Sequence, residues 1–289
     1  MHTADQNFLG LEPRFSDYKT AKTVILPAPF EASTSYQEGT KLGPKAILEA
    51  SQQVELYDIE LARDCHTQGI HTLETFDFSK TDAPTACKML YEKTKKVLED
   101  GKFPIMLGGE HTISYGMFEA LFEKYPNLSI FHIDAHTDMR EAYEGNPYSH
   151  ASVLYLMRKS CKKTVSIGIR SMCEEERLYV NENKVPVYYD FQTQKTGFNP
   201  KDLLKHLTQD VYVTIDVDGL SPTLVPSTGT PEPGGLGYYE TLDILREIFK
   251  NKNVVGCDFV ELMPIPGLVH GDFAVAKLIY KCIGYKYYL

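Results

Sequence analysis

The chain has 289 residues, of which 43% are apolar, and this composition suits either one large α/β core or two smaller ones. Its formal net charge of −9 argues against a nucleic-acid partner, because phosphate binding needs a basic surface. Residues 1–18 lack a basic segment followed by an apolar one, and no apolar run approaches the roughly 18 residues of a membrane span, so we expect a cytoplasmic protein with no membrane partner.

Segments typical of strands and helices alternate along the chain. Strands are predicted at 23–27, 103–107, 129–133, 164–169, 185–189, 211–215 and 253–260. Helices are predicted between them, at 43–51, 83–100, 113–125, 173–183, 238–250 and 272–283. This alternation predicts α/β architecture, with a single doubly wound, mostly parallel sheet, helices on both faces, and residues 1–289 as one domain.

Polar segments begin where three of the predicted strands end. They are "GGEH" (108–111), "DAHTD" (134–138) and "DVD" (216–218). Within "DAHTD" the polar residues are spaced by two, so in extended chain their side chains point to one side. Because doubly wound sheets bind ligands beyond the carboxyl ends of their strands, a site is predicted at this edge.

These segments supply four carboxylates and two imidazoles, from His111, Asp134, His136, Asp138, Asp216 and Asp218. One Asp-x-Asp at a strand end is often only a turn or a helix cap. Unpaired carboxylates crowded together would repel one another, whereas divalent cations would compensate them. Carboxylates with some imidazole favour Mn²⁺ over zinc, and six ligands suit two metals about 3.5–4 Å apart.

The motifs "GGEH", "DAHTD" and "DVDGLSP…GTPEPGGL" resemble the three metal-binding motifs of the ureohydrolase family, which includes arginase, agmatinase, guanidinobutyrase and formiminoglutamase. The resemblance extends over nearly the whole chain, from 30 to 264. It implies an arginase-like fold, a binuclear manganese centre, and hydrolysis of a guanidino group to urea and an amine by a metal-bridging hydroxide. It also implies a homotrimer or homohexamer.

Carried over by motif, the resemblance assigns one Mn²⁺ to His111, Asp134, Asp138 and Asp216. It assigns the second Mn²⁺ to Asp134, His136, Asp216 and Asp218, so that Asp134 and Asp216 bridge. Asp138 would also orient the hydroxide. His150 matches the family's active-site histidine, which can protonate the leaving amine near pH 7. Glu261 matches the glutamate that holds the guanidinium by two parallel hydrogen bonds.

Other residues have more modest interpretations. His132 is expected in the core or supporting the ligands, and Asp258 is expected to anchor a loop. Ser221 stands where the family commonly has Asp, which changes no ligand but affects how that loop is held. The six cysteines contain no C-x-x-C pair, which predicts free thiols. No role is assigned to His2, His66, His71, His206 and His270.

The segment 139–150 bears on the substrate. It lacks the Asn- and Ser/Thr-rich arrangement with which arginases hold an α-amino-acid group. Arg140 could bind a carboxylate, but Glu141 and Glu144 beside it favour a distal amine. The sequence therefore favours a small cationic guanidino substrate, agmatine, giving putrescine and urea for polyamine biosynthesis. Alternatives are aminopropylagmatine, 4-guanidinobutanoate, arginine or a formimino compound. A non-catalytic member of the family is less favoured, because every motif residue is present.

Overall fold

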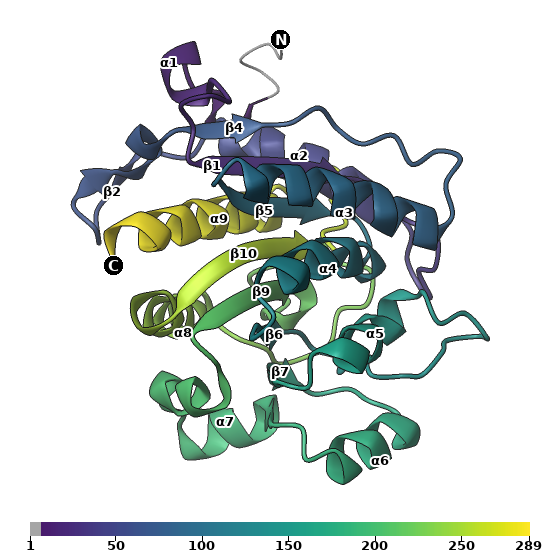
Figure 1. Cartoon of the computed structure of the whole chain (residues 1–289). Helices are drawn as coiled ribbons and strands as arrows, with labels where there is room; N and C mark the ends of the chain where they lie inside the picture. The colour runs from purple at the N-terminus through teal and green to yellow at the C-terminus, as the bar shows by residue number, and fades with distance from the viewer. Residues whose placement is uncertain (1–6) are drawn as a thin grey trace.

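A single eight-stranded sheet organises the chain, and all of its paired strands are parallel (Figure 1). The computed structural model describes residues 7–289, so His2 lies outside the described part. The strands run in the order β4 (Ile70–Thr72), β1 (Thr23–Ala28), β5 (Phe103–Gly108), β10 (Asn253–Val260), β9 (Asp210–Asp216), β6 (Ser129–Ile133), β7 (Thr164–Ile169) and β8 (Val187–Tyr189). The predicted fold class is confirmed.

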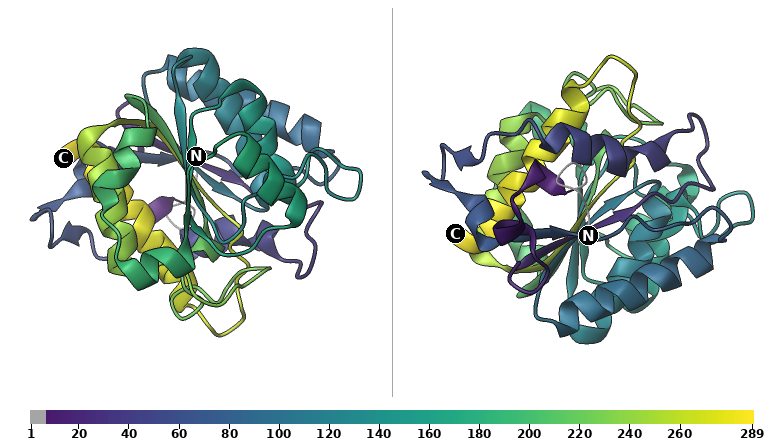
Figure 2. Two further views of the ribbon diagram at one scale, coloured as in Figure 1. Left: turned by 90° about the horizontal axis from the view of Figure 1, so that it is seen from below. Right: turned by 90° about the horizontal axis from the view of Figure 1, so that it is seen from above.

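Helices cover both faces of the sheet, because its strands are apolar on both sides. One core joins the sheet to α2 (Gly43–Ser51), α8 (Tyr238–Asn251) and α9 (His270–Tyr288). The other joins it to α3 (Ala83–Glu99), α4 (Ser114–Lys124), α5 (Val153–Ser160) and α6 (Glu174–Glu182). Figure 2 shows the sheet between the two helical layers. Successive side chains of β1 divide between the cores, Ile25 entering the first and Val24 and Leu26 the second.

The main difference between the predicted and the observed elements is that the prediction lacks several short strands and helices. The predicted strands and helices all occur, most with ends within one or two residues of those observed. The sequence did not reveal β4, the hairpin of β2 (Tyr57–Asp58) and β3 (Arg63–Asp64), or the helices α1 (Pro13–Ser16), α5 and α7 (Asp190–Thr196). The strands among these are two or three residues long, too short to establish a hydrophobic period.

Short 3-10 helices lie in the loops, and several carry site residues. They are η2 (Phe8–Gly10), η3 (Thr40–Leu42), η4 (Cys65–Gln68), η5 (His111–Ile113), η6 (His150–Ser152), η7 (Pro200–His206) and η8 (Val217–Gly219). The six cysteines are free thiols, and all but the half-buried Cys173 are buried. Among residues 7–289, no helix is both long enough and apolar enough to cross a membrane.

Candidate metal centre and active site

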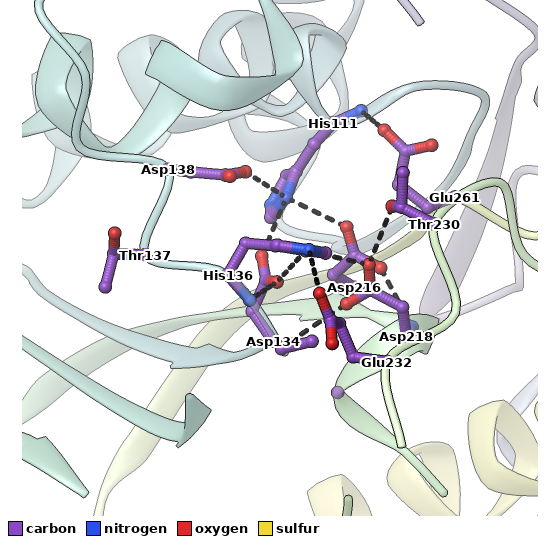
Figure 3. A network of polar contacts seen from close by, with 12 residues as sticks. His111, Asp134, His136, Thr137, Asp138, Asp216, Asp218, Thr230, Glu232 and Glu261 are labelled. Carbon is purple, nitrogen blue, oxygen red and sulfur yellow. Dashed lines mark hydrogen bonds and ion pairs between the residues drawn. The ribbon is translucent and has the colours of Figure 1, made fainter. Parts of the chain in front are cut away.

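The predicted ligands converge at the carboxyl edge of the sheet, where the adjacent strands β5, β10, β9 and β6 end (Figure 3). His111 follows β5, the segment 134–138 follows β6, and Asp216 is the last residue of β9. Parallel neighbours end at the same edge, so segments more than 100 residues apart in the chain lie side by side. Glu261 joins them directly after β10.

His111 lies among three carboxylates. Its Nδ1 is 3.3 Å from Asp134 Oδ2, 3.1 Å from Asp138 Oδ2 and 3.4 Å from Asp216 Oδ2. The ring is fully buried, yet this nitrogen makes no hydrogen bond of good geometry. A buried imidazole nitrogen directed at three carboxylate oxygens without bonding to any of them is what a cation-binding site requires.

His136 forms the second part of the cluster. Its Nδ1 lies 3.0 Å from Asp218 Oδ2 and 3.5 Å from Asp134 Oδ1. Asp134 therefore directs one carboxylate oxygen toward His111 and the other toward His136, the position that a bridging ligand needs (Figure 3). Asp216 and Asp218 are held together, because Asp216 Oδ1 accepts a hydrogen bond of 2.9 Å from the backbone N–H of Asp218.

Burial makes this cluster electrostatically unfavourable without a cation. Burial, followed by the charge of Asp134, raises the pKa of Asp138 to about 7. Burial and the charges of Asp218 and Asp134 raise the pKa of Asp216 well above its usual value. Burial alone would raise the pKa of Asp134 as well, but the charge of His132 and the nearby imidazoles of His111 and His136 lower it well below its usual value. Because these buried carboxylates cannot all be ionised without repelling one another, the cluster is suited to bind divalent cations, which would compensate their charge.

A hydrogen-bonded chain behind His111 fixes its ring. His111 Nε2 lies 2.9 Å from the hydroxyl of Thr214, which donates a 2.8 Å hydrogen bond to Asp258 Oδ1. Tyr212 donates to the other oxygen of Asp258. The expectation that Asp258 anchors a loop is wrong, because this residue is fully buried within β10. Sequence reasoning missed Thr214, although its place two residues before Asp216 puts it on the same side of β9.

His132 supports Asp134 in a similar way, in agreement with the sequence interpretation. Its Nε2 is 2.8 Å from Asp134 Oδ2, and its Nδ1 is 3.0 Å from the hydroxyl of Ser166 on the neighbouring strand β7. The loop at 229–236 covers the other side of the cluster. Its Thr230 donates to Asp218 Oδ2 at 3.3 Å, and Glu232 Oε1 lies 3.9 Å from His136 Nε2.

A cavity of about 280 Å³ opens over the carboxylates, and both His150 and Glu261 line it. Glu261 Oε1 accepts a 2.7 Å hydrogen bond from the backbone N–H of His111. Burial, followed by the charge of Glu110, raises the pKa of Glu261 well above its usual value. Asp138 and Glu261 both have positive φ, 51° and 63°. Such strained backbone in non-glycine residues persists only where surrounding contacts hold it.

The polar residues at the outer part of the cavity differ from the sequence expectation. Arg140 and Tyr143 line it, and Arg140 Nε lies 3.7 Å from the buried carboxylate of Glu176. Glu141 instead lines a separate hollow, and Glu144 is exposed outside both. The predicted acidic mouth made by these two glutamates is therefore wrong, because neither lines the cavity and Glu141 lies instead with Tyr155 and Tyr179 in the separate hollow.

Ser221 and two of the histidines without an assigned role, His66 and His206, lie away from the cluster. Ser221 shares a 2.9 Å hydrogen bond with the hydroxyl of Thr223, which holds its own turn. His66 is buried against the ring of Phe15, and His206 lies 3.2 Å from the hydroxyl of Tyr188. None of these residues lines the cavity.

Comparisons with known proteins agree with this geometry. The family model described as "Arginase family" matches residues 21–284. A protein of Synechocystis sp. named N(1)-aminopropylagmatine ureohydrolase is 40% identical over 280 residues, with 93% of this chain and 90% of that protein covered. A Bacillus anthracis protein named agmatinase is 37% identical over 265 residues, covering 89% and 88%. The structure of the agmatine ureohydrolase of Thermoplasma volcanium matches with a TM-score of 0.87 and 29% identity, covering 97% and 94%.

Proposed function

The chain belongs to the arginase family, and from this premise we propose that it hydrolyses the guanidino group of agmatine or a close cationic analogue, releasing urea and an amine. The observation that carries the proposal is the buried carboxylate–imidazole cluster at the floor of a cavity lined by His150 and Glu261. The family's motif residues are all present and converge on one site, which disfavours a non-catalytic role.

The donor set fits two divalent cations, for which we propose Mn²⁺. His111, Asp134, Asp138 and Asp216 would hold one ion, and Asp134, His136, Asp216 and Asp218 the other. The open Nδ1 of His111 and the two-sided placement of Asp134 support this division. When bound, such a pair lowers the pKa of water and supplies hydroxide at neutral pH.

Glu261 is suited to orient the substrate. A carboxylate has two acceptor sites on each oxygen, so this side chain can retain the backbone N–H of His111 and still accept two parallel hydrogen bonds from a guanidinium. That contact would place the guanidinium carbon above the cluster. Asp138, which also lines the cavity, can accept a hydrogen bond from the attacking oxygen.

His150 is suited to assist the departing amine. An amine is a poor leaving group until it is protonated, and imidazole delivers a proton near neutral pH. Burial lowers the pKa of His150, although the charge of Glu110 opposes this effect. The lowered pKa makes the ring a readier proton donor once charged.

The substrate class follows from what the cavity offers. Its lining contains no Asn, and its aliphatic hydroxyl residues Ser35, Ser171 and Thr230 are dispersed along the chain. From the segment 139–150 the lining includes Arg140, Tyr143 and His150, and the Arg140 side chain lies 3.7 Å from the carboxylate of Glu176. A substrate carboxylate would therefore lose water and regain few hydrogen bonds, at a cost of about 1–3 kcal/mol. At about 1.4 kcal/mol per tenfold, agmatine should exceed arginine by roughly 5- to 140-fold in kcat/KM.

Aminopropylagmatine is a specific second candidate, since a relative at 40% identity carries that name. The test is kcat/KM for urea release from agmatine, aminopropylagmatine, 4-guanidinobutanoate and arginine with Mn²⁺ present, with formamide release followed for formimino compounds. Arginine equal to or better than agmatine would contradict the substrate argument. If guanidinobutanoate wins, Arg140→Ala should abolish its advantage, because Arg140 is the cation at the outer cavity.

We further propose that residues 1–289 act as one domain, that the enzyme works in the cytoplasm in polyamine biosynthesis, and that it assembles as a homotrimer or homohexamer. The site residues are spread from position 111 to position 261, so no segment shorter than 111–261 holds the whole cluster. Sedimentation of the purified chain tests the assembly.

A further inference from the structure

A buried carboxylate lies beside the cluster without being part of it. Glu110 is fully buried and precedes His111 in the chain. Its Oε2 accepts hydrogen bonds of 2.6 Å from the backbone N–H groups of both Ala32 and Ser33. Its Oε1 accepts from the hydroxyls of Ser33, at 2.8 Å, and Thr112, at 2.7 Å. Four donors thus fix the carboxylate and the segment that carries Ser33.

Ser33 connects this carboxylate to His150. The Ser33 oxygen lies 3.2 Å from His150 Nδ1 and accepts a 3.1 Å hydrogen bond from the His150 backbone N–H. A hydroxyl has one hydrogen to donate. If that hydrogen pointed to His150, the Ser33 oxygen and Glu110 Oε1 would face each other at 2.8 Å with no hydrogen between them. The hydroxyl must therefore donate to Glu110, which leaves it an acceptor toward His150.

We propose that Ser33 and Glu110 are positioning residues that keep a proton on Nδ1 of His150, so that only Nε2 exchanges protons with the substrate. This inference rests on the proposed function. In the charged ring, the Nε2 proton passes to the departing nitrogen as the C–N bond breaks and that nitrogen takes the bonding electron pair. The neutral ring keeps its Nδ1 proton and regains one from water at Nε2.

The surroundings of the ring agree with this role. Tyr143 packs edge-on against His150, with ring centroids 5.4 Å apart, so the ring is held by a contact besides the hydrogen bond. Burial lowers the pKa of His150, the charge of Glu110 raises it, and the charges of His136 and His111 lower it. The cavity that His150 lines also contains other charged or titratable side chains, among them Asp138, Arg140, Tyr143, Glu176, Asp216, Asp218 and Glu261. Glu110 also accepts the hydrogen bond of the Ser33 hydroxyl, and the oxygen of that hydroxyl lies beside His150 Nδ1.

The test compares Ser33→Ala, which removes the acceptor, with Ser33→Thr, which keeps a hydroxyl, in the Mn²⁺-loaded enzyme. Ser33→Ala should lower kcat by roughly tenfold to a hundredfold, with KM within about twofold, because misplacement of a reacting group affects chemistry more than binding. The limb of the pH profile that belongs to His150 should move to lower pH. Ser33→Thr should restore most of kcat, and the exposed Ser79→Ala should match the wild type.

A double-mutant cycle decides whether Ser33 acts through His150. In the His150→Asn background, Ser33→Ala should cause no further loss of kcat. Metal content and the melting temperature of each variant, measured alongside, separate positioning from unfolding. A wild-type kcat in Ser33→Ala, or equal fold losses in both backgrounds, would overturn this inference and leave the proposed function standing. Absence of urea release from every guanidine by the wild type would overturn both.

Discussion

Replacing Thr214 with Val tests whether the chain behind His111 controls the metal centre. The Thr214 hydroxyl lies between two fully buried groups, 2.9 Å from His111 Nε2 and 2.8 Å from Asp258 Oδ1. Valine has the same branched shape, so packing within β9 should persist. The substitution removes the hydroxyl alone and leaves both neighbours without this partner.

The expected loss of folding stability depends on how many hydrogen-bond partners the two neighbours lose. A buried polar group left without its partner costs about 1–3 kcal/mol. His111 Nε2 bears this cost fully, whereas Asp258 keeps the hydrogen bond from Tyr212 and bears part of it. We expect the free energy of unfolding to fall by about 2–4 kcal/mol. A freer ring should also weaken the ion held by His111 by roughly 10–100-fold, the usual effect of losing such a support.

The assay is urea-induced unfolding of the metal-free protein, together with Mn²⁺ titration of the folded protein. Thr214→Ser is the matched control, since it keeps the hydroxyl and loses a methyl group, so its Mn²⁺ affinity should stay close to that of the wild type. The reasoning is refuted if Thr214→Val binds both ions as tightly as the wild type, or if Thr214→Ser weakens the site more than Thr214→Val does.

Three further predictions test the site and the fold. Asp216→Ala should lose both metal ions, whereas His111→Ala should lose one preferentially. Metal analysis after gel filtration measures the ions retained by each variant, and equal losses in the two variants would contradict the bridging role of Asp216. Gly109→Ala should destabilise the chain by more than about 1–3 kcal/mol, because an added Cβ would meet a backbone carbonyl oxygen at 2.0 Å. Gly237→Ala, with φ −73° and nothing within 4 Å of the new Cβ, should change the unfolding midpoint little. Burial lowers the pKa of His66, so at pH values below about 6.5 this residue binds more protons in the unfolded chain than in the folded one. The free energy of unfolding should therefore fall as pH drops through that value. This fall should be smaller in His66→Leu, and an unchanged pH dependence of the free energy of unfolding would contradict the prediction.

The sequence predicted the sheet well because its strands are buried on both faces. Short, mostly apolar segments rich in β-branched and aromatic residues, such as 129–133 and 253–260, mark such strands, and their ends coincide with those observed. The same signal fails for β4, a three-residue edge strand, and for α5, which begins only three residues after His150. Short elements depend on the neighbours they pack against, which local sequence does not specify.

The convergence of the predicted ligands was also accessible from sequence, because motif spacing and the strand-end rule place His111, Asp134 and Asp216 at one edge. The direction of Glu141 and Glu144 was not accessible. It depends on how the whole segment 139–150 packs against its neighbours, such as Tyr155 and Tyr179 beside Glu141, and no local pattern specifies that packing.

By itself, then, the sequence determined the fold class, the family and which acidic and imidazole residues meet at one edge of the sheet, because these depend on periodicity and on motifs within short segments. Only the tertiary structure decided how the supports are connected. Thr214 reaches His111 from a strand 103 residues away, and Ser33 reaches His150 across 117 residues. Such contacts arise when parallel strands bring distant loops to one edge. Their partners are therefore set by strand order and by the direction of single side chains, which no local pattern records.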